Sequence, residues 1–332
     1  MKRHQGNEPL SPLERALLDR IQVDFPLEET PYESLGRSMS VSAQEVRDAI
    51  AHLRRTGVIR RIGGSFAPAA LGYISTLVAA QVERDALESA AAAASAFPEV
   101  THNYEREGPY NLWFTVVTPS EARLEKILGA VRACAGVRSA HSLPAVRTFK
   151  LRVDFTFERT KPTAAAMAPV LTVQRLDEDD RRIIARASGD LPDSDQPFDA
   201  MAAELGYRPA FLLTRLRNYR QRGILRRFGA ILRHQLAGFV ANGMSVWNAF
   251  ATSLERLAEV LAARPEVSHC YERPALPDWP YTLYAMIHGQ SKQQCLSVAE
   301  DVARKTGVTD YRVLFSLREF KKTSWQYDLD AD

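Results

Sequence analysis

The stretch Thr56-Gly-Val-Ile-Arg-Arg-Ile-Gly63 decides the fold, because it returns in the second half of the chain as Arg222-Gly-Ile-Leu-Arg-Arg-Phe-Gly229, 166 positions later. A second segment, His102-Asn-Tyr-Glu-Arg106, returns as His269-Cys-Tyr-Glu-Arg273 at an offset of 167. Pro109-Tyr110 then matches Pro280-Tyr281 at an offset of 171, so the second copy carries a four-residue insertion. A register kept over most of each half indicates that the chain is a duplication.

Each copy begins with a helical pattern. Apolar residues recur at helical spacing over residues 13–23 and 42–55 of the first copy, and over residues 176–187 and 208–222 of the second. Gly57 and Gly223 stand where a glycine C-cap is expected. A short strand follows each of these caps. This order predicts a winged helix-turn-helix in each half.

After Gly72 and Gly238 the pattern becomes strand, helix, strand, strand, helix, strand. In the first copy these elements are expected at residues 73–82, 86–97, 100–104, 110–117, 121–134 and 137–148, and the second copy repeats them within residues 239–320. The order predicts a ferredoxin-like βαββαβ sandwich. The fold class is therefore α+β, a tandem duplication with four domains. We expect winged helix-turn-helix units at 10–65 and 173–232, ferredoxin-like domains at 66–157 and 233–325, and a linker at 158–172.

Composition narrows the class of protein. The 332 residues carry 43 Lys+Arg against 40 Asp+Glu, and 45% of them are hydrophobic, which excludes a largely disordered chain. No window holds about eighteen uninterrupted apolar residues, so no membrane span is expected. Three widely spaced cysteines argue against a disulfide scaffold or a four-thiolate zinc site. We expect a cytoplasmic protein without a metal site of its own.

Two families resemble this chain. The order of domains in each half is similar to the leucine-responsive regulators (Lrp/AsnC), which bind DNA as dimers and higher oligomers. A sharper resemblance, to the siroheme decarboxylase family, covers about residues 10 to 325 and looks like the form in which two related subunits are fused. It rests on these segments: Arg226-Arg-Phe-Gly-Ala-Ile-Leu-Arg-His234, Ala237-Gly238, Asn242-Gly-Met244, His269-x-Tyr-Glu-Arg-Pro274 and Trp279-Pro-Tyr281.

The second resemblance implies an enzyme, a carboxy-lyase. It would convert two acetate side chains of siroheme to methyls, giving 12,18-didecarboxysiroheme on a route to haem d1 or to haem. Siroheme and its products would be the partners, and no cofactor is required if the macrocycle accepts the electrons. A homodimer of the fused chain is a further possibility. The residues leave open whether one half or both form an active site, and in which order the acetates react.

Arginines at matched positions suit a substrate with eight carboxylates, because a guanidinium binds a carboxylate through two hydrogen bonds. The alternative for the paired arginines is a wing that contacts DNA phosphates, or a solvated pair. Their repetition in both halves favours a ligand site. The candidate substrate-binding arginines are Arg60, Arg61, Arg106, Arg226, Arg227, Arg233 and Arg273.

Only two of the seven histidines, His102 and His269, recur at the repeat offset. Each stands two residues before a tyrosine and four before an arginine, so a strand would place all three side chains on one face. The alternative is a structural polar network at the rim of the sheet. Histidine suits proton donation near neutral pH. The candidate catalytic residues are His269 and His234, as proton donor or iron ligand in either order, with His102 as first-half counterpart; Tyr104 and Tyr271 would hydrogen-bond carboxylates or an imidazole.

The competing function is a fused Lrp/AsnC-type transcriptional regulator that senses a small metabolite. A DNA-reading helix normally exposes basic and amide side chains. The helix of the first half would instead expose Gln44, Glu45 and Asp48. The matching helix of the second half would expose a plausible DNA-binding face with Arg208, Arg215, Arg217 and Arg220. Because only one module looks suitable, DNA binding is not expected and the enzyme is favoured.

Overall fold

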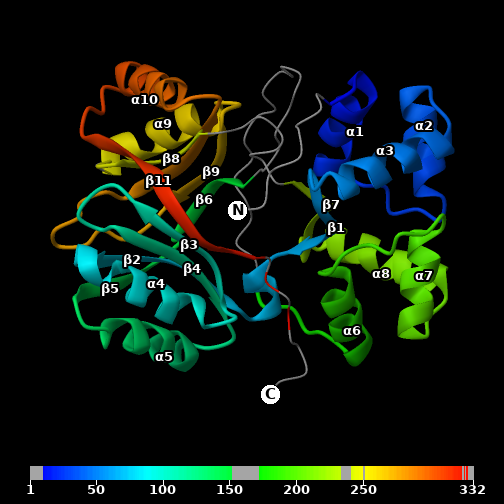
Figure 1. Ribbon diagram of the computed structural model, residues 1–332, viewed down its shortest axis with the longest axis horizontal. Coiled ribbons are helices and arrows are strands. Elements are labelled where there is room, and N and C mark those ends of the chain that lie inside the picture. The colour runs from blue at the N-terminus through cyan, green and yellow to red at the C-terminus, as the bar shows by residue number, and fades with distance from the viewer. Residues whose placement is uncertain are drawn as a thin grey trace.

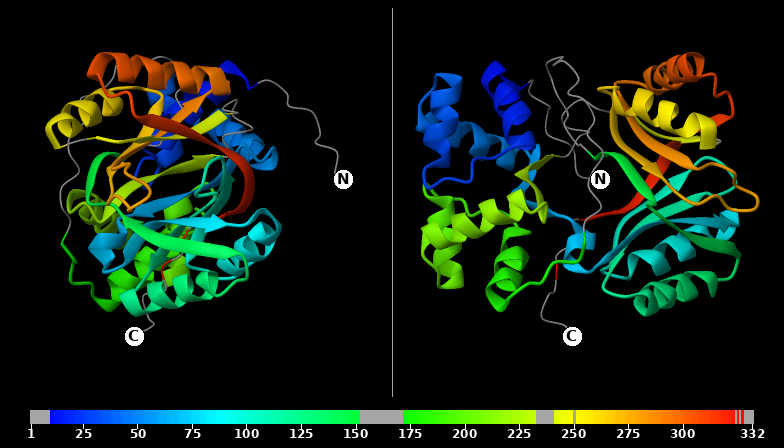
Figure 2. Two further views of the ribbon diagram at one scale, coloured as in Figure 1. Left: turned by 90° about the vertical axis from the view of Figure 1, so that its left-hand side faces the viewer. Right: turned by 180° about the vertical axis from the view of Figure 1, so that it is seen from behind.

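The computed structural model describes residues 10–151, 172–232, 241–249, 251–323, 325 and 327. The helical modules of both halves form one layer, and the β-sheets with their covering helices form the other (Figure 1). The view from behind shows the same division (Figure 2). Each half thus contributes one unit to each layer. The expected linker, residues 158–172, falls outside the described residues except for its last residue, and the domain boundaries stay predictions.

Each helical module consists of three helices and a strand. Gly57 and Gly223 follow the third helix with φ angles of 76° and 73°, so both adopt the left-handed conformation predicted for a C-terminal cap. The strands β1 and β7 pair antiparallel with Gly63 opposite Gly229, so the two modules share one two-stranded sheet. The elements are α1 (Pro12–Val23), α2 (Pro31–Met39), α3 (Ala43–Arg55) and β1 (Ile59–Phe66) in the first module, and α6 (Glu178–Ala187), α7 (Pro197–Leu205), α8 (Pro209–Gln221) and β7 (Leu225–Leu232) in the second.

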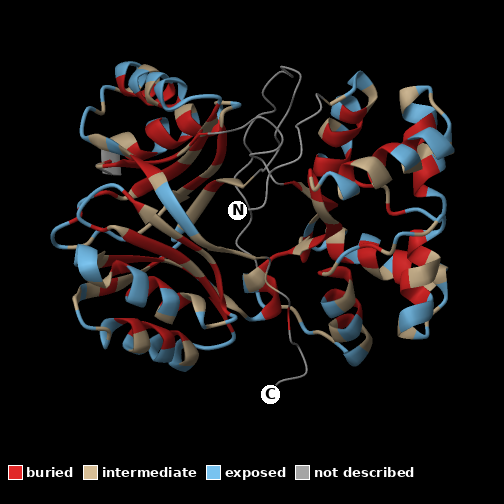
Figure 3. Ribbon diagram, viewed as in Figure 1, coloured by how far each residue is buried: buried red, intermediate tan, exposed pale blue. Residues whose placement is uncertain are grey.

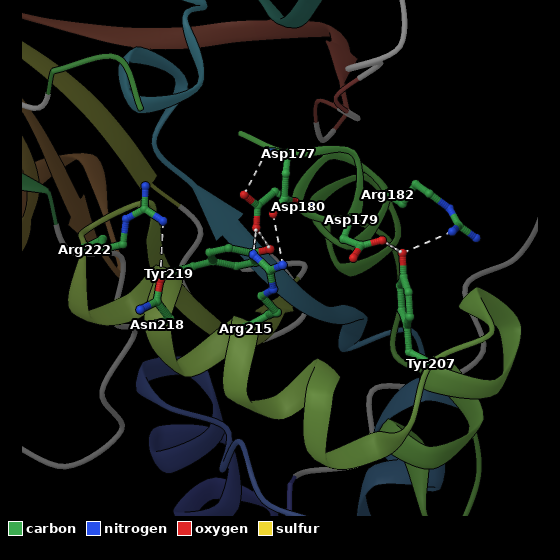
Figure 4. A network of polar contacts seen from close by, with 9 residues as sticks. All are labelled: Asp177, Asp179, Asp180, Arg182, Tyr207, Arg215, Asn218, Tyr219 and Arg222. Carbon is green, nitrogen blue, oxygen red and sulfur yellow. Dashed lines mark hydrogen bonds and ion pairs between the residues drawn. The ribbon is translucent and has the colours of Figure 1, made fainter. Parts of the chain in front are cut away.

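A capping box begins the first helix of each module, Ser11 with Glu14 in α1 and Asp177 with Asp180 in α6. Asp180 is only 3% exposed and accepts hydrogen bonds from Tyr219 and Arg215 of α8 (Figure 4). Arg215 also pairs with Asp177. Burial and the bond to Asp180 raise the pKa of the Tyr219 hydroxyl, so this phenol keeps its proton. The network fastens α8 to α6.

Each sheet domain has the predicted βαββαβ order. Both halves arrange their strands alike, as β5-β2-β4-β3 and as β11-β8-β10-β9, which is the ferredoxin-like order. The helices cover the outer face of each half-sheet (Figure 1). The elements are β2 (Ile74–Val82), α4 (Leu87–Ser95), β3 (Val100–Arg106), β4 (Leu112–Thr118), α5 (Glu121–Arg132) and β5 (Val137–Pro144), then β8 (Ala241–Trp247), α9 (Ala251–Ala262), β9 (Val267–Glu272), β10 (Leu283–Gly289), α10 (Lys292–Thr306) and β11 (Tyr311–Lys322).

The last strand of each half crosses into the other half. β11 pairs with β8 through residues 311–315 and with β3 through residues 316–322. The single strand predicted at 137–148 was wrong: it divides at Ala145 and Val146 into β5, which pairs with β2, and β6 (Arg147–Leu151), which pairs with β9. The pairing with the other half begins at the break, where the Val146 N–H donates to the Glu272 carbonyl. The resulting nine-stranded sheet begins with β5 and ends with β6, so it nearly closes on itself.

Aromatic side chains from both halves fill the space between the two half-sheets. The cluster contains Tyr110 and Trp113 from the first half, and Trp279, Tyr281 and Tyr284 from the second. Trp279 donates from Nε1 to the Tyr284 hydroxyl. Buried residues follow the strands of both half-sheets, whereas the outer faces of the covering helices are exposed (Figure 3). The segments Pro109-Tyr110 and Trp279-Pro-Tyr281 thus supply a core that joins the halves.

Candidate active site

The two arginines of each repeated pair do different things, because successive residues of a strand point to opposite faces. Arg61 of β1 donates from Nη1 to the Gly189 carbonyl of the second module at 3.3 Å. Arg227 of β7 donates from Nη1 to the Gln22 carbonyl of the first module at 2.6 Å. The two donors occupy matched positions of the internal repeat, and each acceptor lies near the end of the first helix of the other module. Both arginines therefore hold the helical modules together.

Arg60 and Arg226, the first members of the pairs, face the sheet layer. The positive charge of Arg60 acts on Tyr104, and that of Arg226 acts on His269 and Tyr271. Neither arginine has a carboxylate partner among the residues that the structure describes. Two arginines at matched positions thus offer their charge to the same side of the sheet as the predicted histidines and tyrosines.

His102 and His269 lie on the inner face of the sheet, at the same place in β3 and β9. The neighbouring residues point the other way: Asn103 donates to the Ala91 carbonyl of α4, and Cys270 belongs to the core beneath α9 and α10. Burial raises the pKa of the Cys270 thiol to about 12, which keeps it protonated. The placement of the two histidines therefore follows from strand alternation.

The predicted alignment of histidine, tyrosine and arginine on one face is confirmed in both halves. The rings of His102 and Tyr104 have centroids 6.3 Å apart, and those of His269 and Tyr271 are 5.9 Å apart. Arg106 lies over the Tyr104 ring at 5.4 Å, and Arg273 lies over the Tyr271 ring at 4.8 Å. Burial and the Glu319 carboxylate raise the pKa of Tyr104, and burial raises that of Tyr271, so both phenols stay protonated as donors.

Arg106 and Arg273 also join the two halves of the sheet. Arg106, which is 4% exposed, donates from Nη1 to the Leu314 carbonyl of β11 at 2.9 Å, and Arg273 donates to the Leu143 carbonyl of β5. The Nε atom of each arginine has no hydrogen-bond partner among the described residues. These arginines fix the frame of the site, and each retains one unpaired donor.

The electrostatic surroundings of His269 show which groups converge. Burial, together with the field of nearby cationic groups, lowers the pKa of His269 to about 4, so the ring is neutral at neutral pH. These groups come from the other half-sheet, from β7 and from the residue that follows β9: His102, Arg226, Arg227 and Arg273. The structure therefore brings the two matched histidines into one positively charged environment, to which both halves contribute.

Two predicted site residues, Arg233 and His234, lie outside the described residues. Other residues at the site were missed by sequence reasoning. Arg147 pairs with Glu272, and Arg318 pairs with Glu105, so an arginine of each crossing strand binds the glutamate beside the matched tyrosine of the other half. A signal existed in the sequence, since Arg147-Thr-Phe-Lys150 returns as Arg318-Glu-Phe-Lys321 at the offset of 171.

The arginines considered for DNA reading make contacts within the protein. Arg215 is bound in the network of Figure 4. Arg217 donates from Nε to the Leu27 carbonyl, and Arg220 pairs with Asp24, so both bind the first module. They line an open hollow of about 660 Å³ between the modules, away from the histidines. Among the described residues, no cluster of three metal-binding side chains occurs and no helix is long and apolar enough to cross a membrane.

Each of the two layers matches the model of a known protein family. Residues 14–60 and 180–226 match the siroheme decarboxylase NirDL-like HTH domain, and residues 70–150 and 236–321 match the AsnC-like ligand-binding domain. A siroheme decarboxylase of Hydrogenobacter thermophilus is 35% identical over 312 residues, which cover 94% of this chain and 93% of that protein. The siroheme decarboxylase alpha subunit of Desulfovibrio desulfuricans is 43% identical over 146 residues, 44% of this chain and 84% of its own.

A solved structure is similar to nearly the whole molecule. The crystal structure of the siroheme decarboxylase NirDL in co-complex with an iron-uroporphyrin III analogue has a TM-score of 0.71 and 31% sequence identity. The alignment covers 94% of this chain and 93% of that one. Both the helical layer and the sheet layer are therefore shared with a protein that was solved with an iron tetrapyrrole.

Proposed function

This chain belongs to the siroheme decarboxylase family, and we propose that it converts two acetate side chains of siroheme to methyls, giving 12,18-didecarboxysiroheme for haem d1 or for an alternative route to haem. One observation carries this proposal. Two histidines at matched positions of the repeat share one positively charged environment, with protonated tyrosines beside them. A polycarboxylate that must receive protons at carbon suits this combination.

We assign proton donation to His269. Each acetate loses its carboxylate as carbon dioxide, leaves its electron pair to the conjugated macrocycle, and takes up one proton to become a methyl. A donor must lie within hydrogen-bond reach of that carbon. His269 is neutral, half-buried and surrounded by cations that attract the carboxylates of the substrate. His102 faces the same substrate from the other half. His234 stays a candidate for proton donation or iron ligation on the family motif.

The three matched pairs of arginines have different roles in this proposal. Arg60 and Arg226 bind carboxylates of the substrate, because their charge faces the histidines and tyrosines and neither forms an ion pair with a carboxylate among the described residues. Arg61 and Arg227 hold the helical modules in place. Arg106 and Arg273 hold the sheet and retain one Nε–H each. Arg233 stays a candidate from the sequence, and Tyr104 and Tyr271 donate hydrogen bonds.

The proposed reaction needs no cofactor, since the macrocycle itself accepts the electrons. The proposal places the protein in the cytoplasm, with the substrate and its products as partners, and it allows a homodimer of the whole chain. A DNA-binding role is not favoured. Three of the four basic side chains considered on α8 and at its N-cap bind other segments of the protein. A phosphate backbone would have to displace them.

Anaerobic incubation of the protein with siroheme tests the function. We expect two equivalents of carbon dioxide per siroheme, and a product whose mass is lower by that of two carbon dioxide molecules. His269→Ala should lower the rate by at least about a hundredfold, because it removes the proton donor. Unchanged siroheme together with tight, operator-specific DNA binding would instead support the regulator. Full turnover by the His269→Ala variant would refute the residue assignment alone.

A further inference from the structure

A chain of hydrogen bonds leads away from His269 into the sheet. Ser268 Oγ lies 2.7 Å from His269 Nδ1 and also 2.7 Å from His288 Nε2. His288 Nδ1 lies 2.7 Å from Asn242 Oδ1. His288 and Asn242 face each other directly on the paired strands β10 and β8. The chain thus runs through three neighbouring strands and reaches an amide oxygen.

A β-bulge makes the first link possible. The pairing of β9 with β10 jumps from His269 opposite Met286 to Val267 opposite Ile287, so Ser268 is the extra residue. A bulge turns a side chain that would otherwise point to the other face. It lets the hydroxyl of Ser268, which is 5% exposed, bond the ring of the next residue.

The second half alone carries this chain. In the first half, a bulge at Thr101 likewise places its Oγ1 3.0 Å from His102 Nδ1. The position of His288 is occupied by Val117: the two N–H groups donate to the matched carbonyls of Glu266 and Glu99. The valine side chain has no nitrogen, so among the described residues no second imidazole continues the chain beyond the threonine hydroxyl. Both halves therefore have the bulge, but only the second half has a second imidazole at this place.

The bond partners define where the protons lie. Asn242 Oδ1 accepts only, so His288 carries a proton on Nδ1. With His288 neutral, Ser268 donates to its Nε2 and accepts from His269 Nδ1–H, which leaves His269 Nε2 bare. With a second proton on His288, both bonds of Ser268 reverse, while the bond to Asn242 keeps its direction. His288 Nε2–H then donates to Ser268, Ser268 donates to His269 Nδ1, and His269 carries its proton on Nε2.

We propose that His288 is a positioning residue that stores the proton for decarboxylation and passes it through Ser268 to His269; this inference rests on the proposed function. As His269 Nε2–H moves to the substrate carbon, the Ser268 proton moves to Nδ1 and the His288 Nε2 proton moves to Ser268. His288 loses one positive charge, and the carbon gains the proton that replaces its carboxyl group. Reprotonation of His288 from solvent prepares the second acetate.

The arrangement explains how a neutral donor can work. His269 is neutral because burial, together with the neighbouring cations, lowers its pKa and disfavours a further charge there. Giving up Nε2–H without replacement would leave an imidazolate, which is prohibitively basic. The relay supplies Nδ1 with a proton during the same step, and the ring is neutral before and after. It also makes His269 and His102 inequivalent, although both face the substrate.

Single-turnover reactions of the full chain with siroheme test the relay. His288→Gln, His288→Phe and Ser268→Ala should each lower the rate of carbon dioxide release about 10- to 100-fold and leave the siroheme affinity, from absorption titration, within about twofold. Ser268→Thr should restore the rate to within about threefold, as Thr101 makes the same bond in the first half. His141→Gln, a half-buried histidine packed against Tyr110, is the matched control and should leave the rate unchanged.

Wild-type rates in both His288 variants would overturn the relay, as would an equal loss in His141→Gln.

Histidine-labelled NMR gives a readout that does not depend on turnover. In the neutral state, His269 and His288 should both carry the proton on Nδ1, and Ser268→Ala should shift His269 toward the Nε2–H form. A wild-type His269 protonated on Nε2, with His288 neutral, would refute the chain. Absence of carbon dioxide from the wild type would refute the function alone, since the NMR result still decides the relay.

Discussion

Adjacent arginines in the repeated motif separate into two roles at the scale of the residue. Arg226 faces the site and Arg227 binds the carbonyl of Gln22, although the sequence presents them as one basic pair. Strand alternation alone predicts that two successive side chains diverge. The sequence could not show which member faces the histidines, because that depends on where the sheet layer lies.

Arg226→Ala and Arg227→Ala should therefore have different consequences. Arg226→Ala should weaken siroheme binding about 10- to 100-fold with little change in stability, because it removes a charge-assisted bond to the substrate. Arg227→Ala should lower the free energy of unfolding by about 1 to 3 kcal/mol, because a buried carbonyl loses its donor. Absorption titration and urea unfolding measure the two quantities. Equal effects of both variants on binding would contradict the division.

The depressed pKa of His269 links stability to pH. The unfolded ring takes up a proton near its ordinary value of 6.5, whereas the folded ring does so only at about 4. The native state therefore loses stability as the pH falls between these values. His269→Asn removes this contribution, so its unfolding free energy should fall less steeply from pH 7 to pH 5, by about 1 to 2 kcal/mol. Parallel pH profiles of the two proteins would exclude this environment for His269.

The elements show which parts of the fold a sequence can predict. The helical periods, the glycine caps and the βαββαβ order were all readable, because they depend on local pattern. The division of residues 137–148 was not, since a strand's period does not reveal its partner. The relay was missed for a related reason: a search for repeated histidines excludes His288, whose counterpart is Val117.

The glycines that end the repeated motif are required by the contact between modules. A Cβ on Gly63 would lie 2.1 Å from the Gly189 carbonyl oxygen, and one on Gly229 would lie 2.5 Å from that of Ile21. Gly63→Ala and Gly229→Ala should each cost at least about 1 to 3 kcal/mol of stability. Gly129→Ala in α5, where nothing lies within 4 Å, should instead stabilise by about 0.5 to 1 kcal/mol. Thermal unfolding of the three variants measures the expected loss of stability at Gly63 and Gly229 and the expected gain at Gly129. An unchanged stability of Gly63→Ala would contradict the close packing.

At the scale of the whole molecule, the crossing strands make each half depend on the other. β6 belongs to the first half but pairs with β9, and β11 belongs to the second half but pairs with β3. Residues 1–165 and 166–332, produced together, should co-purify as a one-to-one complex. Each half alone should aggregate, because it exposes unpaired strand edges. Size-exclusion chromatography of the separate and joint products measures this. Stable, monomeric single halves would contradict the dependence.

Carrying both crossing strands on one polypeptide has a consequence for assembly. Two separate chains would exchange strands only when they meet, and their folded fraction would fall on dilution. A tether keeps the partners at an effective concentration on the order of millimolar, whatever the amount of protein present. The unfolding midpoint of the intact chain should therefore be independent of its concentration. A cell that makes only a few copies would still obtain a complete site from each molecule translated.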